Sequence, residues 1–182
     1  MWLTVPIVRK EGQLINEVMI DNSKNWEKSH CKSIEQNYSS ASYFKWFRPD
    51  FELIYQKQWE KLADLNIALM YRMALQLGIR IPAMMKSSEL KTSGSKTDRL
   101  IPILKAVGAD SFIEGVAGKD YLDVRKMNET GIEVFWFEYQ HPVYPQKGEF
   151  IGYLSALDLL FNIGDKAIGY IRQGVNLVRA EI

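Results

Sequence analysis

One segment of the chain, His141-Pro142-Val143-Tyr144-Pro145-Gln146, combines three side chains that can hydrogen-bond with two prolines. The prolines favour a stiff, extended loop that would present His141, Tyr144 and Gln146 in a fixed order. The other histidine, His30, falls on an apolar helix face, where a packed and hydrogen-bonded role is expected. His141 is therefore the general acid or base that the sequence offers, with Tyr144 and Gln146 as substrate contacts. An ordinary proline loop with a surface histidine is the alternative interpretation.

A second candidate is the turn Gly115-Val116-Ala117-Gly118-Lys119-Asp120, which follows one expected strand and precedes one expected helix. Backbone N–H groups and the helix dipole favour an anion at such a turn, and Lys119 adds a positive charge. Gly115, Gly118 and Lys119 are therefore candidate ligands for an anionic group. The sequence has neither GxxxxGK[ST] nor GxGxxG, so a plain strand-to-helix turn remains the alternative.

Ser87 and Ser88 occupy the equivalent place after the preceding expected strand. Ligands of open α/β sheets collect at the carboxyl ends of parallel strands, so these serines, the glycine turn and His141 should face one crevice. Arg99 lies in the first turn of an expected helix, where the dipole disfavours a cation. Because functional sites often break such local rules, Arg99 joins the candidate site.

Other reactive residue types have weaker settings. Cys31 follows His30 directly, but adjacent helix residues point apart, so a buried and inert thiol is expected rather than a nucleophile–base pair. The two histidines are far apart in sequence and a single cysteine excludes any CxxC site, so no structural zinc is expected. Ser155 and Asp158 have the S-x-x-D spacing of a capping box at the start of a helix.

The elements that must position these residues alternate between strand and helix. Three segments, Ile79–Met84, Ser111–Val116 and Ile132–Tyr139, are expected to be mutually parallel strands of one sheet. The first crossover helix would be capped by Thr97 or Asp98, and the second would span Tyr121–Thr130. The expected fold class is α/β with a parallel, Rossmann-like core.

A helical segment near residues 26–78 is expected to be inserted ahead of this sheet. Apolar residues every four positions indicate a helix over Trp26–Tyr38. An aromatic cluster then ends at Pro49, and helices follow over residues 51–59 and 62–77, the last closed by Gly78. Before them, residues 2–9 and 14–20 are expected to form strands.

Composition limits the class of function. The chain has 182 residues, with 23 basic and 22 acidic side chains, so one domain over residues 1–182 and no nucleic-acid partner are expected. No run approaches the ~20 apolar residues of a membrane span, and no signal peptide is visible. A single cysteine suits a reducing cytoplasm. The sequence points to no particular cofactor.

Six stretches together resemble the WbqC-like family of bacterial proteins, often encoded with surface-polysaccharide (O-antigen) genes. They occur in the family's order, span nearly the whole chain, and the last two are the most specific: Trp2-Leu3-Thr4-Val5-Pro6, Ser87-Ser88-Glu89-Leu90, Thr97-Asp98-Arg99-Leu100-Ile101, Gly118-Lys119-Asp120-Tyr121-Leu122-Asp123, His141-Pro142-Val143-Tyr144-Pro145-Gln146 and Leu154-Ser155-Ala156-Leu157-Asp158-Leu159-Leu160-Phe161-Asn162. Through the fourth stretch, Tyr121 joins the candidate substrate contacts.

The resemblance implies a transferase-like role in making or decorating surface glycans such as lipopolysaccharide. The reaction would attach an acyl or aminoacyl group to an amino sugar, with a nucleotide-sugar or an activated acyl donor as the small-molecule substrate. A non-catalytic binding or scaffold protein of a glycan-assembly cluster is the alternative, because no nucleophile–base pair is recognisable.

The chain departs from the family at its start. The family's upstream His-Gln-Pro segment is absent, so the sequence is either a truncated reading or a natural short variant. If a first strand is missing, an unpaired strand or an exposed apolar groove is expected, and it would promote association into oligomers or poor solubility.

Overall fold

The computed structural model describes residues 2–181. These residues form two compact units. Unit 1 contains the residues up to Pro82 together with Pro142–Tyr170, and unit 2 contains Ala83–His141 together with the residues from Ile171 onward. The expectation of a single domain stays a prediction. No helix in the described part of the chain combines the length and apolarity needed to cross a membrane.

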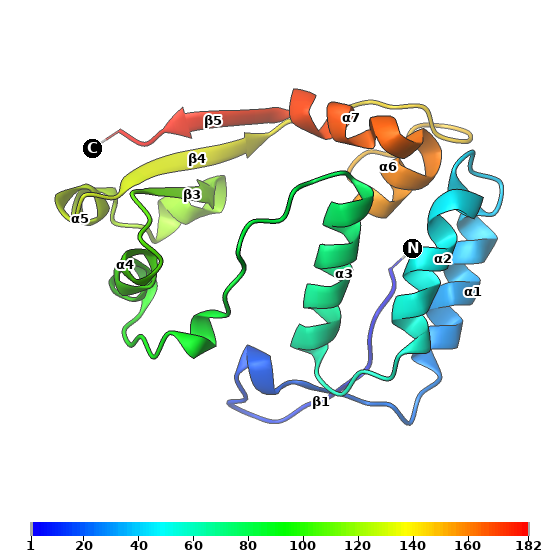
Figure 1. Cartoon of the computed structure of the whole chain (residues 1–182), viewed down its shortest axis with the longest axis horizontal. Coiled ribbons are helices and arrows are strands. Elements are labelled where there is room, and N and C mark those ends of the chain that lie inside the picture. Colours follow the sequence, from blue (N-terminus) through cyan, green and yellow to red (C-terminus); the bar gives the residue numbers. More distant parts are fainter. Residues whose placement is uncertain (1, 182) are drawn as a thin grey trace. The chain divides into compact units, whose positions relative to one another are not determined.

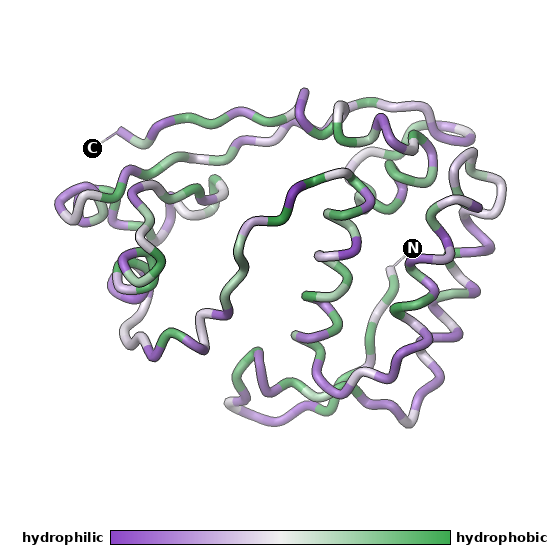
Figure 2. The backbone as a smooth tube through the Cα atoms, in the orientation of Figure 1, coloured by the Kyte–Doolittle hydropathy of each residue, from purple (hydrophilic) through white to green (hydrophobic). Residues whose placement is uncertain are grey.

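Unit 1 is built mainly from four helices: α1 (Trp26–Tyr38), α2 (Phe44–Gln56), α3 (Leu62–Gln76) and α6 (Ala156–Ile163) (Figure 1). Figure 2 shows α1 as largely hydrophilic, and its buried residues are Trp26, His30 and Ile34. Their four-residue spacing is the predicted one. The ring of Phe161, which is fully buried, meets the rings of Tyr38, Phe44 and Phe51 at centroid distances of 5.2, 5.1 and 6.0 Å.

Helix α2 corrects the expected break at Pro49, because the helix runs from Phe44 to Gln56 through that proline. Pro49 is the sixth helical residue, so its missing N–H leaves only one early helical carbonyl without its usual donor. Phe51 and Ile54 are buried as expected, whereas Trp59 lies beyond the helix and its indole N–H donates to the Ile54 carbonyl at 2.8 Å.

Helix α3 confirms the expected helix after residue 61, and Gly78 follows it with a left-handed φ of 68°. The amino-terminal strands are much shorter than expected. Only β1 (Ile7–Val8) and β2 (Met19–Ile20) pair, in antiparallel fashion, and a short 3₁₀ turn (Ile15–Glu17) lies between them.

Unit 2 contains a mixed three-stranded sheet in the order β3 (Ser111–Gly115), β4 (Glu133–Tyr139), β5 (Val175–Arg179). The expected parallel pairing of β3 and β4 is confirmed, with Ser111 opposite Glu133 and Gly115 opposite Phe137. Strand β5 pairs with β4 in antiparallel fashion. The structure therefore has a mixed α/β fold with two small sheets rather than an all-parallel core.

The expected strand Ile79–Met84 is wrong, since this segment has no regular secondary structure. Pro82 stands in the middle of the run, and a proline cannot donate a hydrogen bond within a ladder. Most residues of the run are exposed, so burial does not favour a central strand either. The segment leads into a 3₁₀ turn, Ser87–Glu89.

Helices α4 (Lys96–Ala106) and α5 (Val124–Glu129) accompany one face of the sheet. On that face Val134 and Trp136 are buried, and they share a core with the following residues: Leu104, Leu122, Met127, Ile132 and Ala180. The strand residues that point to the opposite face are more exposed. Ile113 is 55% exposed and Phe137 37% exposed, so one sheet face has a covered core and the other remains accessible. Helix α7 (Ala167–Gln173) carries the chain from unit 1 into unit 2.

Candidate functional site

The carboxyl ends of β3 and β4 bring two of the predicted loops to one edge of the sheet. Because these strands are parallel and Gly115 pairs with Phe137, the chain leaves both strands on the same side. After β3 it forms the 3₁₀ turn Val116–Asp120, and after β4 it reaches His141. The ring of His141 meets that of Tyr139 edge-on at a centroid distance of 6.2 Å. The glycine turn and His141 thus lie at one end of the sheet.

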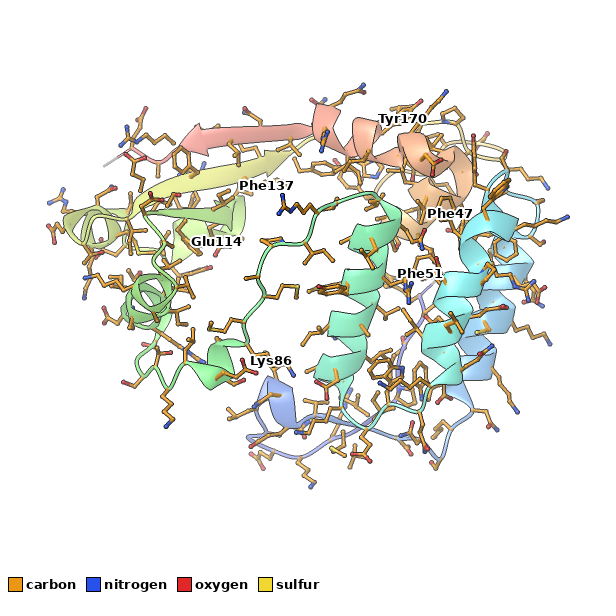
Figure 3. All side chains as sticks on the ribbon, viewed as in Figure 1. Phe47, Phe51, Lys86, Glu114, Phe137 and Tyr170 are labelled. Carbon is orange, nitrogen blue, oxygen red and sulfur yellow. The ribbon has the colours of Figure 1, made fainter. Side chains whose placement is uncertain are left out.

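The backbone amide expected to bind an anion already has a carboxylate as its acceptor. The Gly115 N–H donates to Oε1 of Glu114 at 3.0 Å. The Tyr121 hydroxyl also hydrogen-bonds to Glu114, and this bond raises the pKa of Tyr121. Figure 3 shows Glu114 on β3. An external anion would therefore have to displace Glu114 before it could use this amide.

Gly118 is where the turn needs a glycine. A Cβ there would overlap the Glu114 side chain and would lie 3.1 Å from the Trp136 ring. Next to it, the Lys119 ammonium lies 5.6 Å from the centroid of the Trp136 ring, within cation–π range. Gly115, Gly118, Lys119 and Tyr121 are thus gathered around Glu114 and Trp136.

The start of α4 differs from the expected cap at Thr97 or Asp98, because the helix begins at Lys96. The buried Thr97 hydroxyl instead accepts a hydrogen bond of 2.9 Å from the Asp123 N–H, which joins α4 to the start of α5. Asp98 forms an ion pair with Lys126 at 2.5 Å. Arg99 lies in the first turn of α4, as expected, and its side chain is exposed.

Ser87 and Ser88 are exposed in the short 3₁₀ turn that precedes α4. Lys86 directly precedes them, and Figure 3 shows it well apart from Glu114 and Phe137. Without a strand ahead of them, the serines are not carried to the carboxyl-end edge. The structure therefore does not gather them with the glycine turn.

Tyr144 and Gln146 belong to unit 1, where both donate hydrogen bonds to Asp158. The Tyr144 hydroxyl lies 2.8 Å and the Gln146 Nε2 2.9 Å from the same carboxylate oxygen. Ser155 caps α6 by accepting from the Leu157 N–H at 3.2 Å, but Asp158 turns its carboxylate inward instead of completing the expected box. The S-x-x-D spacing predicts only a local cap, so it could not indicate that Tyr144 and Gln146 donate to Asp158.

Comparison with known proteins then identifies the family. The WbqC-like protein family matches residues 1–170. Uncharacterized protein Rv1507c of Mycobacterium tuberculosis (strain ATCC 25618 / H37Rv) is 34% identical over 179 residues, which covers 94% of this chain and 75% of that protein. The chain belongs to the WbqC-like family. No solved structure matches it.

The WbqC-like match includes the edge formed by β3 and β4 and also Asp158 with its donors Tyr144 and Gln146, whereas β5 lies beyond residue 170.

The other reactive residue types have structural settings. His30 is buried, and its Nε2 lies 3.2 Å from the Thr4 carbonyl oxygen. Burial raises the pKa of the Cys31 thiol, so this cysteine is a poor nucleophile at neutral pH. Within residues 2–181, no three His, Cys, Asp or Glu side chains gather as a metal site.

Proposed function

We propose that this WbqC-like protein is a transferase of bacterial surface-polysaccharide (O-antigen) biosynthesis, acting in the cytoplasm on a small molecule. The observation that carries the proposal is the parallel register of β3 and β4, since it puts the Val116–Asp120 turn and His141 at one sheet edge. In α/β proteins this edge is the usual place for a ligand. Family membership supports the assignment to glycan assembly.

In this proposal Lys119 holds an anionic portion of a nucleotide-sugar or acyl donor. Gly115 and Gly118 provide backbone amides, and Tyr121 provides a hydroxyl at the same turn. Arg99 remains a proposed polar contact, whereas Ser87 and Ser88 are left out of the proposed site because the structure does not gather them with this turn. Tyr144 and Gln146 are assigned to holding the loop after His141, because their hydrogen-bonding groups are already engaged with Asp158.

The proposed reaction transfers an acyl group from a thioester to the amine of an amino sugar. The amine nitrogen attacks the carbonyl carbon, a C–N bond forms, and the C–S bond breaks to release the thiol. His141 takes the proton from the attacking amine and returns it to the leaving sulfur, so protons and electrons balance. A general acid–base group of this kind contributes about 10²–10⁴-fold to the rate.

A non-catalytic binding role is the second candidate, and one observation favours it. Glu114 occupies the amide of Gly115 that an anionic substrate would use. A protein that only binds a partner of the glycan-assembly machinery would need no vacant amide there. The two candidates differ in whether a bound sugar is chemically changed.

The test incubates the full chain with nucleotide-activated amino sugars and acyl thioesters, and follows acylated sugar by mass spectrometry. We expect His141→Gln to slow turnover by about 10²-fold or more while binding is retained. Lys119→Ala should weaken binding about tenfold or more, and Lys10→Ala, an exposed lysine of unit 1, should change neither quantity. Binding without turnover by the wild type would favour the second candidate. The absence of both would reject the proposed site.

A further inference from the structure

Strand β5 forms one edge of the three-stranded sheet in unit 2, since the strand order β3-β4-β5 ends with it (Figure 1). All five of its residues are exposed, and the apolar residues Val175, Leu177 and Val178 are 37, 48 and 39% exposed. Natural sheet edges are commonly protected by a proline, a bulge or several charges. The sequence of β5 has no proline and one charge, Arg179, and its register with β4 is unbroken. This edge is therefore open to another strand.

The hydrogen bonds at the two ends of β5 show which of its backbone groups face outward. At one end, the Gln140 N–H donates to the Gly174 carbonyl at 2.8 Å. At the other end, the Ala180 N–H donates to the Val134 carbonyl at 2.9 Å. Because the backbone groups of an antiparallel strand alternate in direction, the even-numbered residues between these ends bond β4. The N–H and C=O groups that point to the open edge belong to Val175, Leu177 and Arg179.

These three residues are spaced symmetrically about Leu177. If a second copy of β5 lies antiparallel to the first with Leu177 opposite Leu177, then Val175 of each copy faces Arg179 of the other. Each facing pair exchanges two hydrogen bonds, so all six outward N–H groups have a carbonyl acceptor. A register shifted by two residues would leave one outward residue of each copy without a partner in β5. The backbone of β5 is thus complementary to a second copy of itself.

The side chains favour the same antiparallel register. Leu177 meets its own copy, so two exposed apolar side chains cover each other. Arg179 lies opposite Val175, and it keeps its ion pair with Glu133 of β4. Parallel, in-register pairing would instead place two Arg179 side chains next to each other, and like charges in such positions are destabilising.

The opposite edge of the sheet, formed by β3, is less suited to a partner strand. The Glu133 N–H donates to the Asp110 carbonyl at 2.8 Å, so Gly115 is among the β3 residues whose backbone groups point outward. The Gly115 N–H already donates to Oε1 of Glu114, and the chain turns into Val116–Asp120 directly after it. A strand added to β3 would have to displace Glu114.

From this geometry we infer that β5 is the surface through which two copies of this chain pair, with antiparallel strands and a two-fold axis at Leu177. The two three-stranded sheets then form one continuous six-stranded sheet. A strand edge of this length buries less than the roughly 1,200 Å² of a standard stable interface, so the pairing depends on protein concentration. The inference is independent of the proposed transferase reaction.

Site-directed cross-linking tests the register, because Cys31 is the single cysteine of the chain. In a Cys31→Ala background, Leu177→Cys puts two facing thiols on Cα atoms about 5.5 Å apart, within the range of a disulfide. Val175→Cys is the matched control, since the two copies of this exposed residue would lie more than about 13 Å apart. Under mild oxidation we expect a disulfide-linked dimer from Leu177→Cys and about tenfold less from Val175→Cys.

Sedimentation velocity tests the pairing without a cross-link. The wild-type sedimentation coefficient should rise with protein concentration. Leu177→Pro removes one outward N–H but no hydrogen bond to β4, and proline is tolerated at such edge positions, so this variant should stay monomeric. Leu177→Ala keeps the N–H and should still associate, although more weakly. If Leu177→Pro does not fold by circular dichroism, the pair of cysteine variants decides.

Amide hydrogen exchange gives an independent readout for the wild-type chain. Protection of the Leu177 and Arg179 amides should rise with protein concentration, whereas protection of the Ile113 amide on β3 should stay constant. The inference is overturned if the wild type remains monomeric up to about 1 mM, or if Val175→Cys cross-links as efficiently as Leu177→Cys. Protection that rises at Ile113 instead of Leu177 would also overturn it, because the pairing edge would then be β3.

Discussion

Gly164 packs directly against the ring of Tyr43. A Cβ at Gly164 would lie 2.5 Å from Cδ1 of that ring, and the residue has φ 68° and ψ −140°. The Tyr43 N–H in turn donates to the Phe161 carbonyl at 2.9 Å. The end of α6 and the segment before α2 can approach this closely because residue 164 has no side chain.

Gly164→Ala should therefore destabilise unit 1. The backbone conformation alone costs an L-residue about 1–3 kcal/mol, and the overlap with Tyr43 adds to it, so we expect a loss of about 2–4 kcal/mol. Gly169→Ala is the matched control, since Gly169 lies in α7 with no atom within 4 Å of an added Cβ. That change should stabilise by about 1 kcal/mol. Denaturant unfolding measures both, and equal effects would contradict the packing argument.

Periodicity was enough to predict the helices that bury one regular face. The four-residue spacing of Trp26, His30 and Ile34 identifies α1, and Gly78 marks the end of α3. The third strand of the sheet was misplaced because its partner is distant in sequence. Val175–Arg179 has no regular apolar–polar alternation, and nothing local indicates that it pairs antiparallel with β4.

Pro49 yields a second prediction, since it lies inside α2 and not at its end. Pro49→Ala restores one helical N–H and removes the clash of the ring with the preceding turn. The gain is partly offset by a more flexible unfolded chain, so we expect the free energy of unfolding to rise by about 1–2 kcal/mol. Pro145→Ala, outside any helix, should instead lower it by about 0.4–1 kcal/mol. A loss of stability in Pro49→Ala would show that α2 needs this proline.

His30 should make stability depend on pH. Burial lowers the pKa of His30 below its ordinary value of 6.5, so below pH 6.5 the unfolded chain binds the proton more readily than the folded one. Stability is then complete above pH 6.5 and falls as the pH drops from 6.5 toward the lowered pKa, by at most about 1.4 kcal/mol per pH unit. Unfolding free energies between pH 7 and pH 5 should show this slope. His30→Gln should remove it and His141→Gln should retain it.

The positions of candidate site residues could be predicted only where the expected strand pairing was the observed one. Gly118, Lys119 and His141 were placed at one edge because β3 and β4 are indeed parallel. Glu114 and Asp158 were missed as acceptors. The role of Glu114 could have been anticipated, because it lies two residues after Phe112 and therefore on the same face of β3. The role of Asp158 could not, because its donors Gln146 and Tyr144 lie 12 and 14 residues away and reach it only through tertiary packing.

Gly118→Ala should open the anion position at the turn after β3. The new Cβ would overlap Cγ of Glu114 and lie 3.1 Å from the Trp136 ring, so we expect the Glu114 side chain to turn away and to leave both the Gly115 N–H and the Tyr121 hydroxyl. The pKa of Tyr121 should then fall toward its ordinary value, because its bond to Glu114 is the main cause of the rise. NMR titration of the tyrosine rings, assigned with Tyr121→Phe, measures this.

Gly115→Ala is the control for that experiment, since an added Cβ at Gly115 has no atom within 4 Å and Glu114 should stay in place. The same pair of variants separates the two functional candidates. If the turn binds an anionic substrate, Gly118→Ala frees an amide and should tighten binding of inorganic phosphate, by up to about tenfold for one charge-assisted hydrogen bond. Lys119→Ala in the same background should reverse the gain. The contrary result would be a Gly118→Ala variant in which the pKa of Tyr121 has fallen to its ordinary value but phosphate affinity is unchanged. In that case the freed Gly115 amide binds no anion, and the turn has only a structural role.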